Sequence, residues 1–220
     1  MKVELIDYMG GDLSICNAAR VSFEKESSLE DGKIAGRDQK LLNYLAKHKH
    51  WTPFAHTSLS FRISAPVYVA RQLGKHQVGL VWNEVSRRYV DTTPTFHIPH
   101  QWRARADNVK QGSRIESVPK SDQIARNYYL YLETAKELYH CLLEDGVCPE
   151  QARMVLPQSM ITQWIWTGSL AAFARVCNLR LDSHTQAETR EVAREIDSLI
   201  RRLGDFHYSW SALTQGENSV

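Results

Sequence analysis

Residues 57–64 read TSLSFRIS, and apolar side chains alternate with polar ones along this stretch. This alternation is typical of a strand with one buried face, because successive side chains of a strand point to opposite sides. The apolar members fall on the same side: Leu59, Phe61 and Ile63. Pro66 follows closely and suits the first position of a helix, where a missing backbone N–H is no loss. We therefore expect a half-buried strand that leads into a helix over residues 66–76.

The same patterns extend outward in both directions along the chain. They predict further strands at residues 2–8 and 85–90, and a strand or buried segment at 158–166. Helices are expected at 13–23, 38–48, 121–144, 149–156 and 168–180, and a final helix is expected to be capped by Ser183. Residues 27–36 have the polar composition of a loop, and residues 92–100, with two prolines, indicate an extended segment.

The helix predicted at 121–144 carries a long apolar stripe, which indicates packing within the chain or against another subunit. Its members recur at spacings of three and four: Ile124, Tyr128, Tyr131, Ala135, Leu138 and Leu142. Strands that come early and helices that come late favour an α+β fold, with a central antiparallel sheet, flanking helices and a helical C-terminal half. A length of 220 residues suits one domain, and we assign residues 1–220 to it.

The composition excludes disordered and polyelectrolyte proteins. Hydrophobic residues make up 43% and charged residues 24%, and the formal net charge is +2. The charge is uneven, because residues 62–126 hold eleven Lys and Arg against five Asp and Glu. A basic middle indicates either a local anionic ligand such as a nucleotide or a solvated basic face, and charge alone does not separate the two.

The cysteines and histidines indicate a reduced, metal-free protein. The four cysteines have no C-x-x-C spacing, and no apolar run marks a signal peptide or a membrane span, so we expect a cytoplasmic protein without a membrane partner. His48, His50 and His56 lack nearby cysteine or carboxylate ligands, so no metal site is expected. The glycine motifs of Rossmann folds, P-loops and serine hydrolases are absent from the sequence.

Two neighbouring segments carry polar groups suited to binding. If the helix over 66–76 is continuous, an amide, an ammonium and an imidazole share one face: Gln72, Lys75 and His76. If the next segment is extended, Glu84, Ser86 and Arg88 point the same way. Arginine and serine together suit a phosphate, and a carboxylate accepts from a sugar hydroxyl or a ring N–H. A charged strand edge is the other interpretation of this segment.

Residues 72–89 resemble the nucleotide- and flavin-binding motif of flavin-dependent thymidylate synthases, which is an Arg-His-Arg triplet followed by Asn-Glu, Ser and Arg-Tyr. Three further segments resemble motifs of the same family: HWTPFAH at 50–56, EQARMVLP at 150–157 and NLRLDSHTQ at 178–186. The four segments stand in the family's order across about residues 48–190. The ordered set is specific where a single segment would be weak.

The resemblance implies reductive methylation of dUMP to dTMP. Methylenetetrahydrofolate would supply the carbon, NADPH the electrons, and non-covalently bound FAD would carry the hydride, in a homotetramer whose active sites are shared between subunits. Matched position by position, the residues around dUMP would be Gln72, Glu84, Ser86, Arg87, Arg88, Arg153 and Arg180. Those on the flavin would be His50, Thr52, Lys75, His76, Gln77, Glu84 and Asn178, with His50 also near the folate. Arg180 would be the catalytic residue that polarises the uracil ring.

The chain departs from the family's pattern on the flavin side. Lys75-His76-Gln77 replaces the Arg-His-Arg triplet, and eight residues instead of seven separate it from Ser86. Ser169 and Ala171 stand where the family often has Asn and Arg, and Arg175 stands at the position of a further Asn. The loss of one positive charge at Gln77 predicts weaker FAD binding.

A single-stranded nucleic-acid or nucleotide-binding protein without turnover is the alternative. Basic and aromatic residues mix as they do in single-strand binders: Arg87, Arg88, Tyr89, Trp102, Arg103 and Arg105. The modest net charge and the lack of a known binding module count against it, so no nucleic-acid partner is expected.

Overall fold

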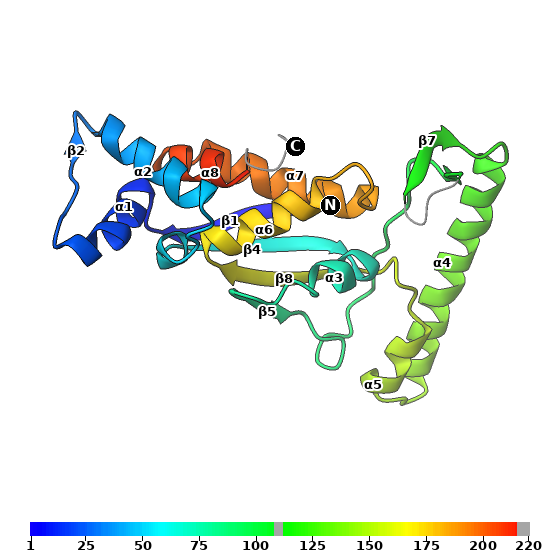
Figure 1. Ribbon diagram of the computed structural model, residues 1–220. Coiled ribbons are helices and arrows are strands. Elements are labelled where there is room, and N and C mark those ends of the chain that lie inside the picture. The colour runs from blue at the N-terminus through cyan, green and yellow to red at the C-terminus, as the bar shows by residue number, and fades with distance from the viewer. Residues whose placement is uncertain (108–111, 215–220) are drawn as a thin grey trace.

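The computed structural model describes residues 1–107 and 112–214. Its centre is a four-stranded sheet in the order β1-β4-β8-β5, and every neighbouring pair is antiparallel (Figure 1). The strands are β1 (Lys2–Met9), β4 (Ser58–Pro66), β8 (Ile161–Gly168) and β5 (Leu80–Glu84). The expected α+β class with a central antiparallel sheet is therefore confirmed.

The alternation in β4 produces the core. Leu59, Phe61 and Ile63 are all fully buried, as the sequence predicts, while Arg62 on the opposite face is exposed. Phe61 meets Phe173 of α6 edge to face, with ring centroids 4.9 Å apart. Aromatic pairs in this geometry add to the hydrophobic gain from burying their area. The apolar face of the sheet is thereby fixed against the helices that cover it.

The helices of the C-terminal half lie on one side of the sheet (Figure 1). They are α6 (Leu170–Arg180), α7 (Ala187–Arg202) and α8 (His207–Thr214). Near the N-terminus, α1 (Asp12–Arg20) and α2 (Gly36–Lys47) pack beside α8. Short 3-10 helices connect other elements along the chain, at Val21–Phe23, Pro53–His56, Arg153–Val155 and Gly204–Phe206.

The helix α4 (Ser121–Glu144) stands at the other end of the molecule, with α5 (Pro149–Ala152) at its foot (Figure 1). Its buried face consists of Leu132, Ala135 and Tyr139, whereas Tyr131 and Leu138 of the predicted stripe are about half exposed. Part of the apolar stripe is therefore exposed and does not pack against the other described residues of the chain. Within residues 1–107 and 112–214, no helix is both long and apolar enough to cross a lipid bilayer.

The predicted helix over 66–76 is too long. α3 covers only Val67–Leu73, with Pro66 as its N-cap, and the chain leaves the helix at Gly74. Glycine is a poor helix former, and the turn continues with a hydrogen bond from His76 N–H to the Leu73 carbonyl oxygen at 2.9 Å. Lys75 and His76 therefore do not share a helix face with Gln72.

The strand predicted at 85–90 is also wrong. β5 ends at Glu84, and Val85 makes the last ladder bond, from its N–H to the Gln163 carbonyl oxygen at 2.9 Å. Beyond it the chain turns, because the Tyr89 and Val90 N–H groups both donate to the Ser86 carbonyl oxygen. The premise that Glu84, Ser86 and Arg88 alternate on one side of a strand therefore fails.

Two smaller expectations also fail. Ser183 does not cap the last long helix; Gln186 is the N-cap, and the Asp182 carboxylate accepts the His184 N–H at 2.7 Å in a preceding turn. The predicted loop at 27–36 contains a short hairpin, β2 (Leu29–Glu30) with β3 (Lys33–Ile34). A second unpredicted hairpin joins β6 (Arg103–Arg105) to β7 (Ser113–Ser117).

Candidate functional site

A cavity of about 600 Å³ opens where α3, the end of β5 and the segment after α5 meet. It gathers five of the residues that the sequence selects for substrate binding: Glu84, Ser86, Arg87, Arg88 and Arg153. Arg71 of α3 also lines it. Four guanidinium groups around one carboxylate and the hydroxyls of Ser86 and Thr162 make a site for an anion that also carries a hydrogen-bond donor.

Both carboxylate oxygens of Glu84 are held by neighbouring side chains. The Thr162 hydroxyl donates to Oε1 at 2.7 Å, and Trp82 Nε1 donates to Oε2 at 3.2 Å. The indole of Trp82 is itself fixed, because it stacks on Trp164 with ring centroids 4.3 Å apart. The pairing of β5 with β8 thus orients the carboxylate before any ligand arrives.

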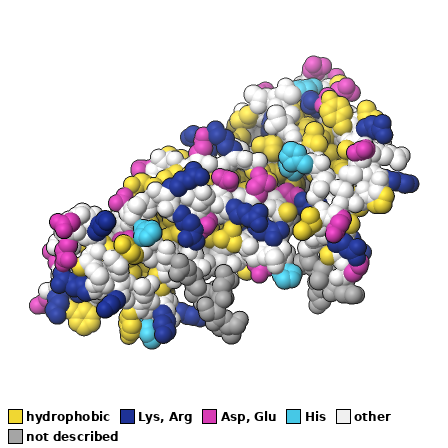
Figure 2. Space-filling model, turned by 90° about the horizontal axis from the view of Figure 1, so that it is seen from above, with side chains coloured by type: hydrophobic (Ala, Val, Ile, Leu, Met, Phe, Trp, Pro, Cys, Tyr) yellow, Lys and Arg dark blue, Asp and Glu magenta, His cyan; other side chains and the backbone are white. Residues whose placement is uncertain are grey.

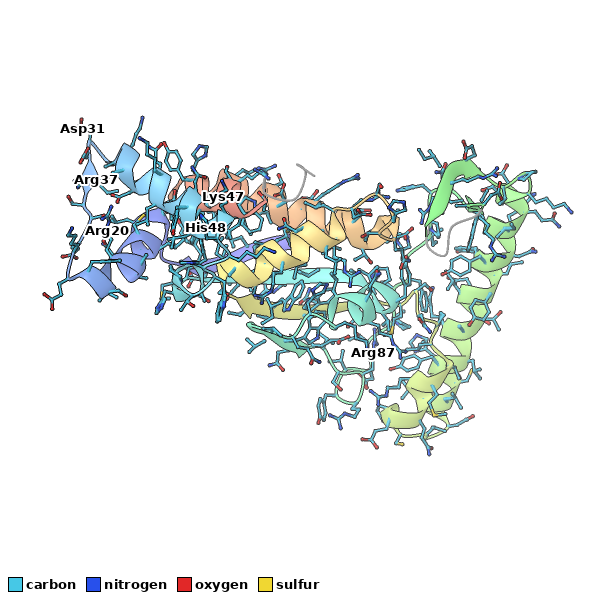
Figure 3. The ribbon with its side chains drawn as sticks, viewed as in Figure 1. Arg20, Asp31, Arg37, Lys47, His48 and Arg87 are labelled. Carbon is cyan, nitrogen blue, oxygen red and sulfur yellow. The ribbon has the colours of Figure 1, made fainter. Side chains whose placement is uncertain are left out.

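The turn after β5 presents Ser86 and two arginines. The Ser86 hydroxyl accepts from the Arg88 backbone N–H at 3.3 Å and from Arg88 Nε at 3.4 Å. Arg87 donates to the Thr92 carbonyl oxygen, and its guanidinium lies over the ring of Tyr139 at 5.9 Å. Figure 3 shows Arg87 between the sheet and the lower part of α4. The sequence position alone does not distinguish the two arginines, but the structure ties Arg87 to α4.

Arg153 reaches the same cavity from a different part of the chain. It lies at the start of the 3-10 turn after α5, and its Nε donates to the Glu150 carbonyl oxygen at 3.3 Å. The side chain is exposed, so its remaining donors are open to a ligand. The Ala-Arg-x-x-Leu-Pro segment is therefore brought beside the Glu84 to Arg88 segment by the fold.

A second cavity of about 640 Å³ adjoins the first. Lys75, His76 and Gln77 line it, and it shares Arg71 and Glu84 with the first cavity. The two halves of the 72–89 motif therefore face one continuous depression. Its cationic and amide donors suit phosphate groups, with one positive charge fewer than the family's triplet supplies.

His76 and Arg180 are direct partners. Arg180 Nε donates to His76 Nε2 at 2.9 Å, which makes His76 a neutral imidazole with its proton on Nδ1. Burial, and then the positive charges of Arg180 and Arg175, lower the pKa of His76. Burial also lowers the pKa of Arg180, although a guanidinium remains protonated at neutral pH. The proposed catalytic arginine is thus held against the middle residue of the Lys-His-Gln triplet.

Arg180 lines a third cavity, of about 460 Å³, together with Asn178 and Arg175. The Asn178 amide nitrogen donates to the Leu213 carbonyl oxygen at 3.0 Å, so one end of this side chain is engaged by α8. Arg175 donates to the Val78 carbonyl oxygen at 2.6 Å and also lines a fourth cavity, of about 660 Å³, beside Trp51. Shared residues and the Arg180–His76 bond connect the four cavities.

Three predicted site residues lie elsewhere. The amide oxygen of Gln72 accepts from the Thr189 hydroxyl of α7, so this side chain turns away from Glu84. His50 lies edge-on to Tyr44 with ring centroids 6.0 Å apart, and neither His50 nor Thr52 lines any of the four cavities. Figure 3 shows His48, close to His50 in the chain, beside the end of α2 and away from Arg87.

The structure adds residues that the sequence patterns do not single out. Arg71 lines two cavities, and Trp82 and Thr162 hold Glu84. Trp82 stands two residues before Glu84. Once β5 is known to be a strand, its alternation predicts that these two side chains lie on the same face and can form a hydrogen bond. Thr162 has no such signal, because its contact depends on the strand pairing. Ser169 caps α6 through the Ala172 N–H, and Ala171 is buried.

The arrangement agrees with comparisons to known proteins. A family model described as "Thymidylate synthase complementing protein" matches residues 4–203. The chain belongs to the flavin-dependent thymidylate synthase family. A family member from Thermotoga neapolitana is 38% identical over 206 residues, covering 94% of this chain and 88% of the relative. One from Thermosipho melanesiensis is 36% identical over 200 residues, covering 90% and 85%.

A solved structure supports the same assignment. The UMP/dUMP methylase PolB from Streptomyces cacaoi, bound with 5-Br dUMP, superposes with a TM-score of 0.85 at 29% identity, and covers 97% of this chain and 94% of PolB. The complex of PolB with 5-Br UMP gives a TM-score of 0.83 at 28% identity, covering 98% and 94%. The family and the fold implied by the sequence resemblance are confirmed, and the chain is an enzyme of this family.

The donors in the second cavity fit the phosphate-bearing part of a flavin nucleotide. Lys75 is exposed, Gln77 is exposed, and Arg71 adds a second cation to the same depression. Among residues 1–107 and 112–214, no group of three or more His, Cys, Asp and Glu side chains is placed to hold a metal ion.

Proposed function

We propose that this enzyme methylates dUMP to dTMP reductively, with methylenetetrahydrofolate as the carbon donor and NADPH as the reductant of bound FAD. The observation that carries the proposal is the convergence of Glu84, Ser86, Arg88 and Arg153 on one cavity. The family to which the chain belongs and the dUMP analogue in the PolB complex support the same substrate.

The substrate's phosphate would bind to Arg88, Arg153 and Ser86. Guanidinium groups offer paired donors to phosphate oxygens, and a hydroxyl adds one more. Arg88 already bonds Ser86, so these two groups are positioned together before binding. Glu84 would accept a hydrogen bond from the sugar or the base, since Thr162 and Trp82 hold both of its oxygens in place. The role of Arg87 would be weaker, because it is committed to Thr92 and Tyr139.

FAD would be held by Lys75, His76 and Gln77, with His50, Thr52 and Asn178 as further contacts, and when bound it would supply the hydride. Arg180 would donate to the pyrimidine edge and stabilise negative charge that develops there. A neutral His76 accepts from Arg180 Nε and leaves the terminal guanidinium nitrogens available for the ring. The cysteines would take no part. Cys16 and Cys177 are buried, and burial raises the pKa of the Cys16 thiol to about 12, while the exposed Cys141 and Cys148 line none of the four cavities.

We further propose a cytoplasmic homotetramer with shared active sites, each built from the single domain of residues 1–220. Two observations support it. The predicted site residues fall into groups that one chain does not bring together, with Gln72, His50 and Thr52 away from Glu84. Exposed apolar side chains also lie along α4, including Leu130 and Tyr131, and hydrophobic atoms gather at that end in Figure 2.

The nucleic-acid alternative has less support from the geometry. Arg103 is paired with Glu188 at 2.7 Å, and Trp102 packs edge to face with Tyr128. Figure 2 shows basic and acidic side chains mixed over the face seen from above. Salt-dependent binding of an oligonucleotide, measured beside dUMP binding, would decide between the two functions.

Substitution of Arg153 tests the dUMP site. A hydrogen bond to a charged group contributes about 1.5–3 kcal/mol, so Arg153→Ala should weaken dUMP binding by at least about tenfold. Arg194→Ala, an exposed arginine on α7 outside the cavities, is the matched control. Calorimetric titration of the flavin-loaded protein with dUMP measures both. Equal affinities in the two variants would remove Arg153 from the site and the cavity from the proposal.

A further inference from the structure

A fifth cavity, of about 470 Å³, lies between α3, the start of α7 and the β6–β7 hairpin. It shares Pro157 and Gln158 with the Glu84 cavity but none of that cavity's charged side chains. None of the residues proposed for dUMP or FAD lines it. It therefore adjoins the Glu84 cavity but presents a different set of polar side chains.

Aromatic rings form the walls of this cavity. Trp102 and Tyr128 meet edge to face at 5.1 Å and 82°, and Tyr68 meets His97 at 6.3 Å and 67°. The Tyr128 hydroxyl is anchored by donating to the His97 carbonyl oxygen at 3.3 Å. Fixed aromatic walls of this kind suit a flat ring, which stacks or packs edge-on between them.

Three buried polar atoms at the cavity have no hydrogen-bond partner among the described residues: Glu188 Oε2, Ser159 Oγ and Trp102 Nε1. Glu188 and Ser159 are each only 8% exposed. The other oxygen of Glu188 accepts from Arg103 at 2.7 Å, so the carboxylate is oriented and its second oxygen is left over. Burying a polar atom without a partner is costly, and such atoms mark places where a ligand supplies the missing bond.

The charges in the cavity balance. Burial would raise the pKa of the Glu188 carboxyl, but the hydrogen bond and charge of Arg103, with smaller contributions from the Glu188 backbone N–H and the Gln186 side chain, lower it, so the group is a carboxylate. Arg103 supplies the compensating positive charge. Burial lowers the pKa of His97 and raises that of Tyr68, so both are neutral near pH 7. A ligand here must be uncharged in the buried part, donate to a carboxylate and accept from an indole N–H.

We propose that this cavity binds the lactam edge of a planar heteroaromatic ring, with the ring N–H donating to Glu188 Oε2 and the adjacent carbonyl accepting from Trp102 Nε1. The Ser159 hydroxyl pairs with a further polar atom of the ring. Uracil, thymine and guanine share this edge, whereas cytosine and adenine lack the ring N–H beside a carbonyl. The assignment does not depend on the reaction proposed for the Glu84 cavity.

Binding of neutral nucleosides tests the proposal. The flavin-loaded protein is first saturated with dUMP, so that the Glu84 cavity is occupied, and is then titrated calorimetrically with uridine or guanosine. The matched ligands are 3-methyluridine and 1-methylguanosine, in which a methyl group replaces the lactam hydrogen. We expect saturable binding of at least one parent nucleoside and at least tenfold weaker binding of its methylated form. Binding of uridine alone or guanosine alone identifies a pyrimidine or a purine site.

Variants locate the bound ring. Trp102→Phe keeps an aromatic wall and removes the N–H, and Ser159→Ala removes the hydroxyl; each should weaken nucleoside binding while dUMP binding stays unchanged. Glu188→Gln should weaken it at least tenfold, and Glu191→Gln, exposed on the same helix, is the control.

The proposal is overturned if neither parent nucleoside binds to the dUMP-saturated protein, or if the methylated forms bind equally well. It is also overturned if Trp102→Phe, folded by circular dichroism, binds as the parent protein does. The methylated ligands need no variant, so a misfolded Glu188→Gln protein leaves the test intact. If the flavin-loaded protein binds no dUMP in the first titration but still binds a nucleoside, the function proposed for the Glu84 cavity is contradicted and the proposal for the fifth cavity stands.

Discussion

Replacement of Arg180 by alanine distinguishes a catalytic role of this residue from a purely structural one. Among the described residues its side chain has one hydrogen bond, to His76 at 2.9 Å, and it occupies the last turn of α6. Loss of such a bond costs about 1 kcal/mol, and loss of a cation at a helix C-terminus costs about 0.3–1 kcal/mol. The free energy of unfolding should therefore fall by about 1–2 kcal/mol, which lowers the melting temperature of a chain this long by about 2–8 °C. The protein remains folded.

The effect on turnover should be much larger than the effect on stability. Removal of one preorganised donor that acts on developing charge typically lowers the rate by about 10²–10³-fold. We expect Arg180→Ala to retain FAD, to remain tetrameric and to be reduced by NADPH at the normal rate. It should fail at the step that consumes reduced flavin with dUMP and methylenetetrahydrofolate. Arg180→Lys should rescue little, because an ammonium lacks the planar pair of donors.

Stopped-flow absorbance of the flavin measures the two half-reactions separately. Arg194→Ala provides the control for loss of a positive charge on a neighbouring helix. If Arg180→Ala slows only flavin reduction, or if it unfolds the protein, Arg180 is a flavin-side or helix-end residue. The proposed polarisation of the uracil ring would then be wrong.

Four other changes have defined outcomes. Gln77→Arg restores the missing charge beside Lys75 and should tighten FAD binding in a fluorescence titration; unchanged affinity would show that Gln77 is misplaced. Replacement of all four cysteines should leave substantial dTMP formation, and abolished chemistry in a folded, flavin-loaded Cys177→Ala protein would contradict this. Thr162→Val removes the 2.7 Å bond to Glu84 and should raise the KM for dUMP more than it lowers kcat, as initial rates would show. Burial lowers the pKa of His97 below its ordinary value of about 6.5. As the pH falls, the unfolded chain therefore takes up a proton on His97 before the folded protein does. Its stabilising contribution is therefore present above about pH 6.5 and is lost as the pH falls; His97→Gln should flatten the acid side of the melting-temperature profile, and the same change at exposed His48 should not.

Periodicity predicted the core elements correctly where one face is buried. The alternation at Leu59, Phe61 and Ile63 gave β4, and the helix predicted at 121–144 coincides with α4. It failed where tertiary pairing decides the boundaries. β5 lies at Leu80–Glu84 and not at 85–90, because its ladder with β8 ends at the bond from Val85 N–H to Gln163, and the next N–H of β8, that of Ile161, donates to Thr95 instead.

The start of α7 and the end of α3 were predicted wrongly for local reasons. Asp182 captures the His184 N–H in a turn, so Ser183 has no helix end to cap. The helix after Pro66 ends at Gly74, a residue that contributes little to helix stability.

The sequence motifs selected candidate site residues but did not predict how the fold groups them. The ordered motifs selected Glu84, Ser86, Arg88 and Arg153, which the fold brings to one cavity. The contact between Arg180 and His76, 104 residues apart, has no counterpart in sequence spacing. Thr162 is missed for the same reason, since a threonine in a strand carries no signal until its neighbour across the sheet is known.

Transfer of a labelled carbon tests the central claim most directly. The purified protein is incubated with dUMP, FAD, NADPH and methylenetetrahydrofolate labelled at the methylene carbon, and the nucleotides are separated and counted. We predict label in the methyl group of dTMP, dependent on each of the four components, and retained when all four cysteines are replaced. A folded, flavin-loaded protein that forms no labelled dTMP, or that forms it without a reductant, would contradict the proposed function.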